Sequence, residues 1–228
     1  MTTRFPNGIT NVEKTSAMGA FGAPDPTKYH LWFDDFDDFD TNMWTITATS
    51  AGTGTSAVSV PDADGGLARI TTAANENDGL FIEWDSETFL IESGKEAWIK
   101  ARFQVGDAIQ SDFIIGLHST DTTPLDATLR FAFISEDGSA ALFFNVDDDT
   151  TDSDSGTVAT LADDTFVTVA AYWDGKGNIK LFADDAHVTT MTGISAPGDA
   201  MAVGIGYLNG AAGAETTDID YLLVAKTR

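Results

Sequence analysis

Cysteine is absent from this chain of 228 residues, and basic side chains are scarce. Without cysteine there is no disulfide framework, no thiolate zinc site and no cysteine nucleophile. Twelve Lys and Arg stand against 36 Asp and Glu, and the formal net charge is −24. Nucleic acids and anionic membranes both select clustered positive charge. The composition therefore predicts no nucleic-acid partner and no membrane partner.

Long apolar runs are also missing. The first residues carry no apolar stretch of the kind that forms a secretory signal, and no run approaches the roughly 20 residues that span a bilayer. Hydrophobic residues nevertheless make up 43% of the chain and aromatic residues 11%, which is the composition of a globular domain. We expect a soluble protein that is made in the cytoplasm.

The first 28 residues differ from the rest. They contain three of the six prolines and show neither a helical nor a strand period. One interpretation is a floppy terminus, which is common. The other is an extended N-terminal arm that orders against a partner, because Phe5, Ile9 and Val12 are more apolar than a pure linker needs. We take residues 1–28 as such an arm and residues 29–228 as one domain.

From residue 29 onward the chain reads as short strands. Apolar and polar residues alternate, β-branched and aromatic residues are frequent, and Gly, Asp, Ser and Thr bound the runs. No window shows a helical stripe. The pattern predicts an all-β, two-sheet antiparallel sandwich of jelly-roll topology. The expected strands cover residues 31–33, 44–47, 57–60, 67–72, 79–84, 97–103, 113–117, 129–134, 140–146, 166–173, 178–182, 187–190, 202–207 and 219–224.

Four segments, in this order and spacing, resemble the concanavalin A-like jelly roll of lectins, glucanases and laminin-G domains. One departure is the pair Asp184-Asp185, where laminin-G-like domains commonly have Asp-Gly. The resemblance covers about residues 29–228 and implies the same fold. The segments are Phe33-Asp34-Asp35-Phe36 with Trp44 downstream, residues 167–175, residues 179–185 and residues 217–224.

The opening residues 1–12 resemble the starts of structural head proteins of tailed bacteriophages. The resemblance implies a non-catalytic capsid decoration, or cement, protein on the outer surface of the virion. It would form a homo-oligomer, a trimer or a dimer, and would bind the major capsid protein. The arm and one edge of the sandwich would make the contacts, with Arg4, Phe5, Ile9 and Val12 as the partner-binding residues.

The segment Glu83-Trp84-Asp85-Ser86-Glu87 has the E-x-D-x-E spacing of the retaining β-glucanases built on this fold. That resemblance implies Glu83 as nucleophile, Glu87 as acid/base and Asp85 as the carboxylate that tunes them. Strand alternation places all three on one face, opposite Trp84. With 36 acidic residues in the chain, the spacing arises by chance about once. Ser86 also replaces an apolar residue of the family, so we assign no catalytic residue.

Two acidic runs are candidates for calcium, which prefers clustered oxygen ligands. The stronger one holds Asp147, Asp149 and Asp152, and the other spans residues 34–40. The spacing of the stronger run does not match the calcium-binding loop, which has glycine in its sixth position. The alternative is a solvated acidic hairpin tip. We therefore assign no metal and no other cofactor.

Three functions thus stay open, and capsid decoration is favoured. The second is a lectin-like carbohydrate-binding module, free-standing or on the virion, that recognises surface glycans. The third is a retaining β-glucanase that uses Glu83 and Glu87. Five Trp and 15 Phe suffice to fill the space between two sheets, so no aromatic side chain is assigned to a sugar site from the sequence.

Overall fold

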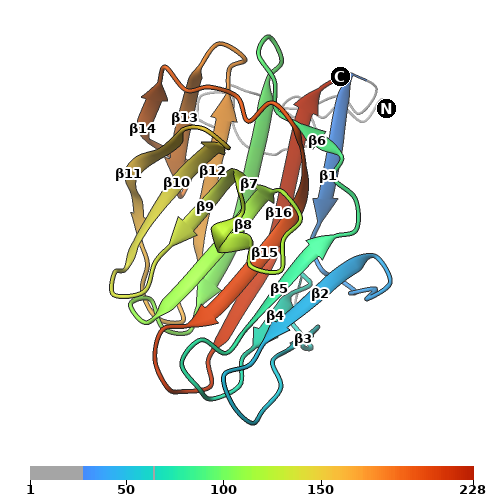
Figure 1. The fold of residues 1–228 in the computed structure, drawn as a ribbon, viewed down its shortest axis with the longest axis vertical. Helices are drawn as coiled ribbons and strands as arrows, with labels where there is room; N and C mark the ends of the chain where they lie inside the picture. The colour runs from blue at the N-terminus through green and yellow to red at the C-terminus, as the bar shows by residue number, and fades with distance from the viewer. Residues whose placement is uncertain (1–27, 64) are drawn as a thin grey trace, which may run out of the picture.

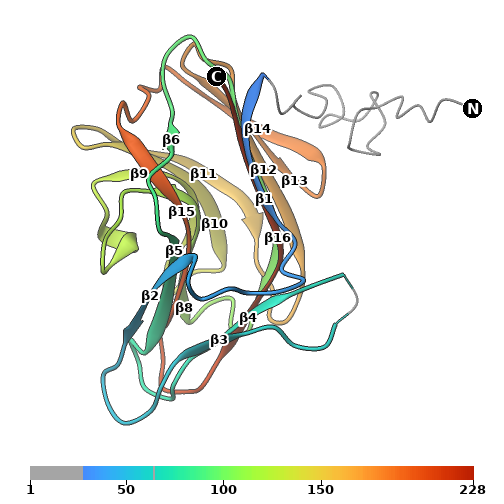
Figure 2. The ribbon, with the colours of Figure 1, turned by 90° about the vertical axis from the view of Figure 1, so that its right-hand side faces the viewer.

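The computed structural model describes residues 28–63 and 65–228, which form two antiparallel sheets of eight strands each, packed face to face (Figures 1 and 2). The all-β sandwich predicted from the alternation is confirmed. Sheet A comprises β1 (Tyr29–Asp34), β3 (Ala57–Ser59), β4 (Ala68–Thr71), β7 (Ala97–Val105), β12 (Val167–Trp173), β13 (Asn178–Ala183), β14 (Ala186–Thr192) and β16 (Thr216–Thr227). Sheet B comprises β2 (Trp44–Thr49), β5 (Gly79–Trp84), β6 (Phe89–Leu90), β8 (Ser111–His118), β9 (Leu129–Ser135), β10 (Ala141–Asp148), β11 (Asp152–Thr160) and β15 (Ala200–Asn209).

Neighbours in both sheets are mostly distant in sequence. Sheet B runs β11-β10-β9-β8-β15-β5-β2, so β15 lies between β8 and β5. In sheet A, β16 lies between β7 on one side and both β1 and β4 on the other. Such crossovers are expected of a jelly roll. Among the described residues no helix is long and apolar enough to cross a membrane.

The core lies between the inner faces of the two sheets. Phe103 of β7 and Phe113 of β8 meet there with ring centroids 4.5 Å apart, and Trp173 is 1% exposed. Full burial of one large apolar side chain contributes about 1.5–3 kcal/mol. This term holds the sheets together without disulfides.

Three tryptophans close one end of the core. Trp84 packs edge-on against Trp32 and Trp44, with centroid distances of 5.6 and 5.4 Å. Trp84 therefore points inward, as alternation along β5 predicts. Glu83 of the same strand is left on the outer face.

The pair Asp184-Asp185 forms the two-residue turn between β13 and β14. Their φ angles are 48° and 62°, and Ala183 pairs with Ala186 across the turn. Positive φ at both central positions is the requirement of a type I′ hairpin, and Asp tolerates it. Asp185 therefore adopts the positive φ that the turn requires, although the Asp-Gly pattern has glycine at this position.

The hydrophobic pattern does not predict two strands, the two-residue β6 and the longer β11. The sequence of β11 is DSDSGTVAT, and only Val158 is buried. It is the edge strand of sheet B, and Asp147 of β10 pairs with Asp152. The acidic run is thus partly strand, and the hairpin tip is only residues 149–151. Charged residues on an edge strand also oppose edge-to-edge aggregation.

Candidate functional site

A hollow of about 470 Å³ lies on the outer face of sheet B, within the range of small-ligand sites. The segment 119–128, which includes the short 3₁₀ turn η2 (Pro124–Asp126), forms one wall of it. Figure 2 shows η2 standing out from this face. The lining side chains come from Thr49, Phe81, Asp112, Thr123, Leu125, Asp126, Arg130, Ile134, Glu136, Asp137, Phe143, Asn145, Asp152, Asp154 and Leu208.

The hollow has an apolar floor because some outward positions of the strands are apolar as well. Phe143 of β10 and Leu125 of the loop are half-buried against a small cluster on β8 and β9, which includes Ile114 and Ile134. This cluster is separate from the main core. The result is an aromatic and aliphatic surface bordered by polar side chains.

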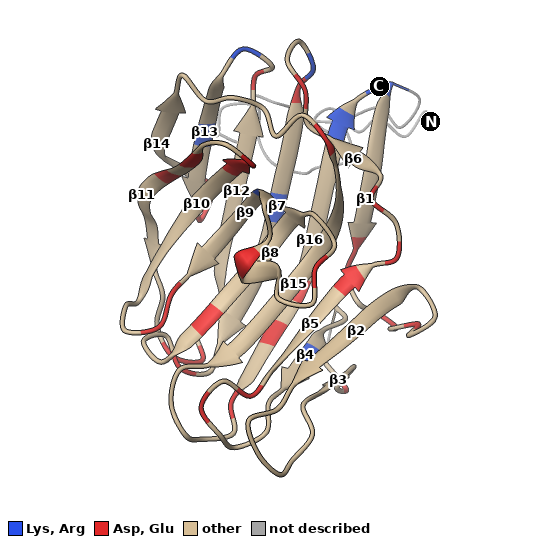
Figure 3. Ribbon diagram, in the orientation of Figure 1, with Lys and Arg blue, Asp and Glu red and all other residues tan. Residues whose placement is uncertain are grey.

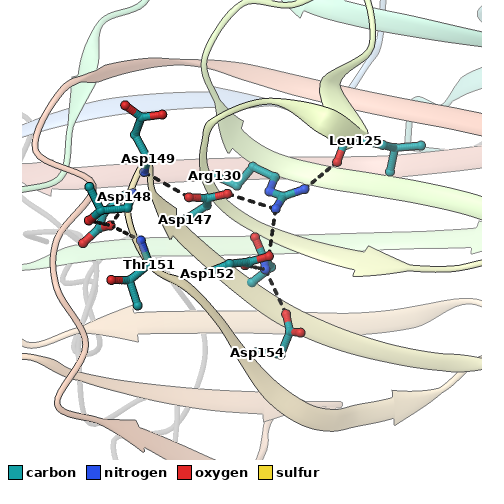
Figure 4. A network of polar contacts seen from close by, with 10 residues as sticks. Leu125, Arg130, Asp147, Asp148, Asp149, Thr151, Asp152 and Asp154 are labelled. Atoms are coloured by element: carbon teal, nitrogen blue, oxygen red, sulfur yellow. Dashed lines mark hydrogen bonds and ion pairs between the residues drawn. The ribbon is translucent and has the colours of Figure 1, made fainter.

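Arg130 ties the wall of the hollow to the β10–β11 hairpin (Figure 4). One guanidinium nitrogen lies 3.1 Å from Asp147 Oδ2 and 3.2 Å from Asp152 Oδ2. The other terminal nitrogen donates to the carbonyl of Leu125. Planar guanidinium groups suit such multiple contacts. Arg130 therefore fixes the loop, β9 and β11 relative to one another.

Asn145 lies at the centre of the acidic side and is 2% exposed. Its amide nitrogen donates to Asp152 and, over 2.8 Å, to Asp154 Oδ1. Its Oδ1 is buried and accepts no hydrogen bond from the described residues. Leaving a buried acceptor without a donor costs about 1–3 kcal/mol. A ligand that supplies a donor here removes this cost.

Negative charge gathers around the hollow, and in Figure 3 acidic segments greatly outnumber basic ones. The pKa of the Asp112 carboxyl is raised, first because the group is desolvated and then because Asp137 and Asp126 repel its charge. The N–H of Asp137 donates to Asp112 over 2.8 Å and opposes this shift. The site therefore favours a ligand that brings hydrogen-bond donors.

The calcium candidates lie beside the hollow. Asp147 and Asp152 share Arg130, which already places a positive charge between them. Asp149 is exposed at the hairpin tip, and its N–H donates to Asp147 Oδ1 over 3.0 Å. In the described ranges, no group of three or more His, Asp or Glu side chains is arranged to hold a metal ion. The sequence analysis assigns no metal to these residues, and that assignment stays a prediction.

Of the candidate catalytic carboxylates, only Glu83 lies on β5, whereas Asp85 and Glu87 follow the strand in the irregular segment 85–88, where strand alternation does not place them. Glu83 Oε1 accepts the N–H of Asp121 over 3.0 Å. Glu87 Oε1 accepts both the N–H and the hydroxyl of Thr120, each over 2.7 Å. Both glutamates thus hold the start of the 119–128 segment.

Asp85, the middle carboxylate, accepts the hydroxyl of Thr45 on β2 over 2.9 Å. Glu83 is 2% exposed, whereas Asp85 and Glu87 are exposed. None of the three lines the hollow. All three carboxylates are therefore engaged in structural hydrogen bonds.

His118 at the end of β8 is a residue of this region that the sequence did not single out. It is fully buried, with Nδ1 3.0 Å from the carbonyl of Ser119 and 3.5 Å from Glu83 Oε1. A Cβ on Gly204 would lie 1.9 Å from His118 Nε2, so only glycine fits there. No local motif reveals this contact, because β8, β15 and β5 meet only in the folded sheet.

Burial shifts both titrating groups of this pair. Desolvation lowers the pKa of His118 to about 4. Desolvation also raises the pKa of Glu83, with smaller contributions from Asp121 and Glu87, while the Asp121 N–H opposes the shift. At neutral pH the imidazole is therefore uncharged.

The predicted partner contacts Arg4, Phe5, Ile9 and Val12 lie outside the described residues. Their role, the capsid partner and the oligomeric state therefore stay predictions.

No protein-family model and no curated protein matches the chain. Solved structures do match. The Emp47p carbohydrate recognition domain is 11% identical over 89% of this chain and 98% of that one, with a TM-score of 0.59. An endo-1,3-β-glucanase from Streptomyces sioyaensis is 14% identical over 90% and 99%, with a TM-score of 0.58. An endo-β-1,4-glucuronan lyase from Trichoderma reesei is 12% identical over 86% and 94%, with a TM-score of 0.54. The fold is a concanavalin A-like jelly roll.

Proposed function

We propose that this protein is a non-catalytic glycan-binding module that seats a saccharide in the hollow on sheet B. The observation that carries the proposal is the hollow itself, where the half-buried Phe143 borders Asn145 and several carboxylates. Sugars present apolar C–H faces and many hydroxyl donors. An apolar floor with a few convergent polar groups matches both features.

The positions of the glutamates favour binding over hydrolysis. A retaining mechanism needs two carboxyl groups roughly 5–5.5 Å apart on either side of the scissile bond. Glu83, the expected nucleophile, is 2% exposed beneath the 119–128 segment and accepts the Asp121 N–H. A sugar in the hollow does not reach it in this arrangement, because Glu83 is not part of the lining.

Capsid decoration, favoured by the resemblance of residues 1–12, depends on residues that the structure does not describe. Neither the fold nor the similar structures support it. The glycan-binding proposal therefore replaces it as the leading function. A place on the outer surface of a virion stays compatible with a glycan-binding module and is a separate prediction.

The test is a glycan array followed by titration calorimetry of the best oligosaccharide. We expect a Kd on the order of 10 µM to 1 mM. Phe143→Ala removes the aromatic floor and should weaken binding at least tenfold. Phe33→Ala is the matched control, because Phe33 is 52% exposed on β1 of the other sheet. Absence of any bound glycan, or equal effects of the two variants, would overturn the proposal.

Retaining β-glucan hydrolysis is the second candidate, because Glu83 and Glu87 both bind the start of the 119–128 segment. It requires the 119–128 segment to move away from Glu83. Reducing-sugar release from a panel of β-glucans, with Glu83→Gln as the control, decides this point. Turnover that Glu83→Gln abolishes would replace the binding proposal with catalysis.

A further inference from the structure

The hollow carries far more negative than positive charge. Its one basic side chain is Arg130, which is committed to Asp147, Asp152 and the Leu125 carbonyl. Anionic saccharides are therefore repelled, and among the described lining residues both terminal guanidinium nitrogens of the one cation are already bound to protein oxygens. The acidic lining residues are Asp112, Asp126, Glu136, Asp137, Asp152 and Asp154.

A second, independent observation is the orphaned acceptor at Asn145. The side chain is 2% exposed, lines the hollow and uses both amide hydrogens on Asp152 and Asp154. Its Oδ1 lacks a donor among the described residues. Two buried lining atoms that can donate, Thr49 Oγ1 and Arg130 Nε, also lack a partner among the described residues, but the carboxylates and Asn145 make acceptors the majority on the polar side of the hollow. The ligand group that fits these oxygens donates hydrogen bonds and has no lone pair of its own that they would repel. A protonated amine is such a group.

We propose that the hollow selects a cationic amino sugar, a saccharide whose amine is free and not acylated. The inference rests on the proposed glycan-binding function and deepens it. An ammonium group offers three N–H donors and a positive charge to the acceptors around Asn145. The carbon face of the same ring lies against Phe143. Acylation of the amine removes the charge and two of the three donors.

Asp112 supports the same assignment. The pKa of its carboxyl is raised first by desolvation and then by the charges of Asp137 and Asp126, and a cation that enters the hollow offsets this repulsion. Binding of an ammonium ligand then lowers the raised pKa of Asp112 and favours release of its proton. Neutral saccharides produce no such release.

The experiment compares four probes of equal length by titration calorimetry at low salt. They are a glucosamine oligosaccharide, its N-acetylated counterpart, a cello-oligosaccharide and an oligouronate. We expect the glucosamine oligosaccharide to bind at least tenfold more tightly than the N-acetylated form, and the oligouronate not to bind. Raising the ionic strength to about 0.5 M should reduce the preference, because the partly exposed charges are then screened.

Asp→Asn variants, which keep nearly the same side-chain shape, separate the contribution of charge to binding from that of shape. Asp126→Asn and Asp154→Asn remove exposed charges from the hollow and should each weaken glucosamine binding by about twofold to fivefold. Both should weaken neutral-sugar binding much less than glucosamine binding, because only the charged ligand loses a charge–charge attraction. Asp38→Asn is the control, since Asp38 is exposed and does not line the hollow.

The outcomes are distinguishable. If the N-acetylated or neutral probe binds as well as glucosamine, the amino-sugar inference is wrong and the glycan-binding function stands. If no saccharide binds, the proposed function itself fails. If oligolysine binds as tightly as the glucosamine probe and competes with it, the ligand is a basic peptide and the saccharide assignment is overturned.

Discussion

Two groups of carboxylates occupy the outer face of sheet B, and they serve different purposes. Glu83, Asp85 and Glu87 follow a recognisable spacing, yet their oxygens accept hydrogen bonds from Thr45, Thr120 and Asp121. The carboxylates of the hollow follow no spacing, and they converge on an open space beside Asn145. The comparison teaches that a motif can be satisfied by structural bonds, while the ligand-facing charge is assembled from separate strands.

The largest expected effect tests how tightly the first group is packed. Gly204→Ala places a methyl group 1.9 Å from His118 Nε2. We expect a loss of about 3 kcal/mol in the free energy of unfolding, because the buried ring cannot move aside. Thermal melting should show a decrease of about 6–12 °C.

Gly213→Ala is the matched control, because its added methyl group meets only Glu215 Oε1 at 3.5 Å. Equal melting temperatures for the two variants would show that His118 and the segment over it move aside to accommodate the added methyl group. In that case the distinction between a closed and an open group of carboxylates fails.

The next largest effect is a loss of folding stability at acidic pH. The pKa of His118 is about 4 in the fold and about 6.5 when unfolded. The unfolded chain therefore binds more protons, and the stability contributed by the neutral imidazole, about 3 kcal/mol, is lost as pH falls from 6.5 to 4. Glu83 acts in the opposite sense, because its raised pKa makes the fold bind its proton more tightly.

Urea unfolding at a series of pH values measures this loss. His118→Gln removes the titrating group, and its stability should decline less steeply than that of the wild type between pH 6.5 and 4. Parallel curves for the two proteins would mean that His118 is hydrated in solution. The Glu83 region would then be as open as the hollow.

The smallest effect separates a structural glutamate from a catalytic one. Glu87→Gln keeps an oxygen that accepts from Thr120, so we expect a change in melting temperature under about 2 °C. Glycan affinity should stay within about twofold. Melting curves and calorimetry provide both numbers, and a loss of saccharide binding would place Glu87 in the ligand site.

Much of the fold follows from local pattern. Residues 79–84 alternate in a way that predicts β5 with the same bounds as the structure. Alternation also predicts that Trp84 enters the core and that Glu83 faces outward. Strand β11 cannot be predicted from local alternation, because an edge strand with a polar outer face carries almost no apolar signal. Its partner β10 and the pairing of Asp147 with Asp152 determine it.

The candidate site depends much less on local pattern. Asp112, Arg130 and Asn145 lie on β8, β9 and β10, and no spacing along the chain announces their convergence. The pairing of His118 with Glu83 likewise depends on Gly204 of the strand between them. Cross-strand register, which is set by the whole sheet, creates these contacts.

The sequence by itself determined the fold class, the acidic character and the face on which residues of the alternating strands lie, because a period of two residues and net charge are local or additive properties. The tertiary structure alone decided which carboxylates are closed under the 119–128 segment and which border an open hollow. The physical reason is that burial and hydrogen-bond satisfaction depend on neighbours brought in from distant strands.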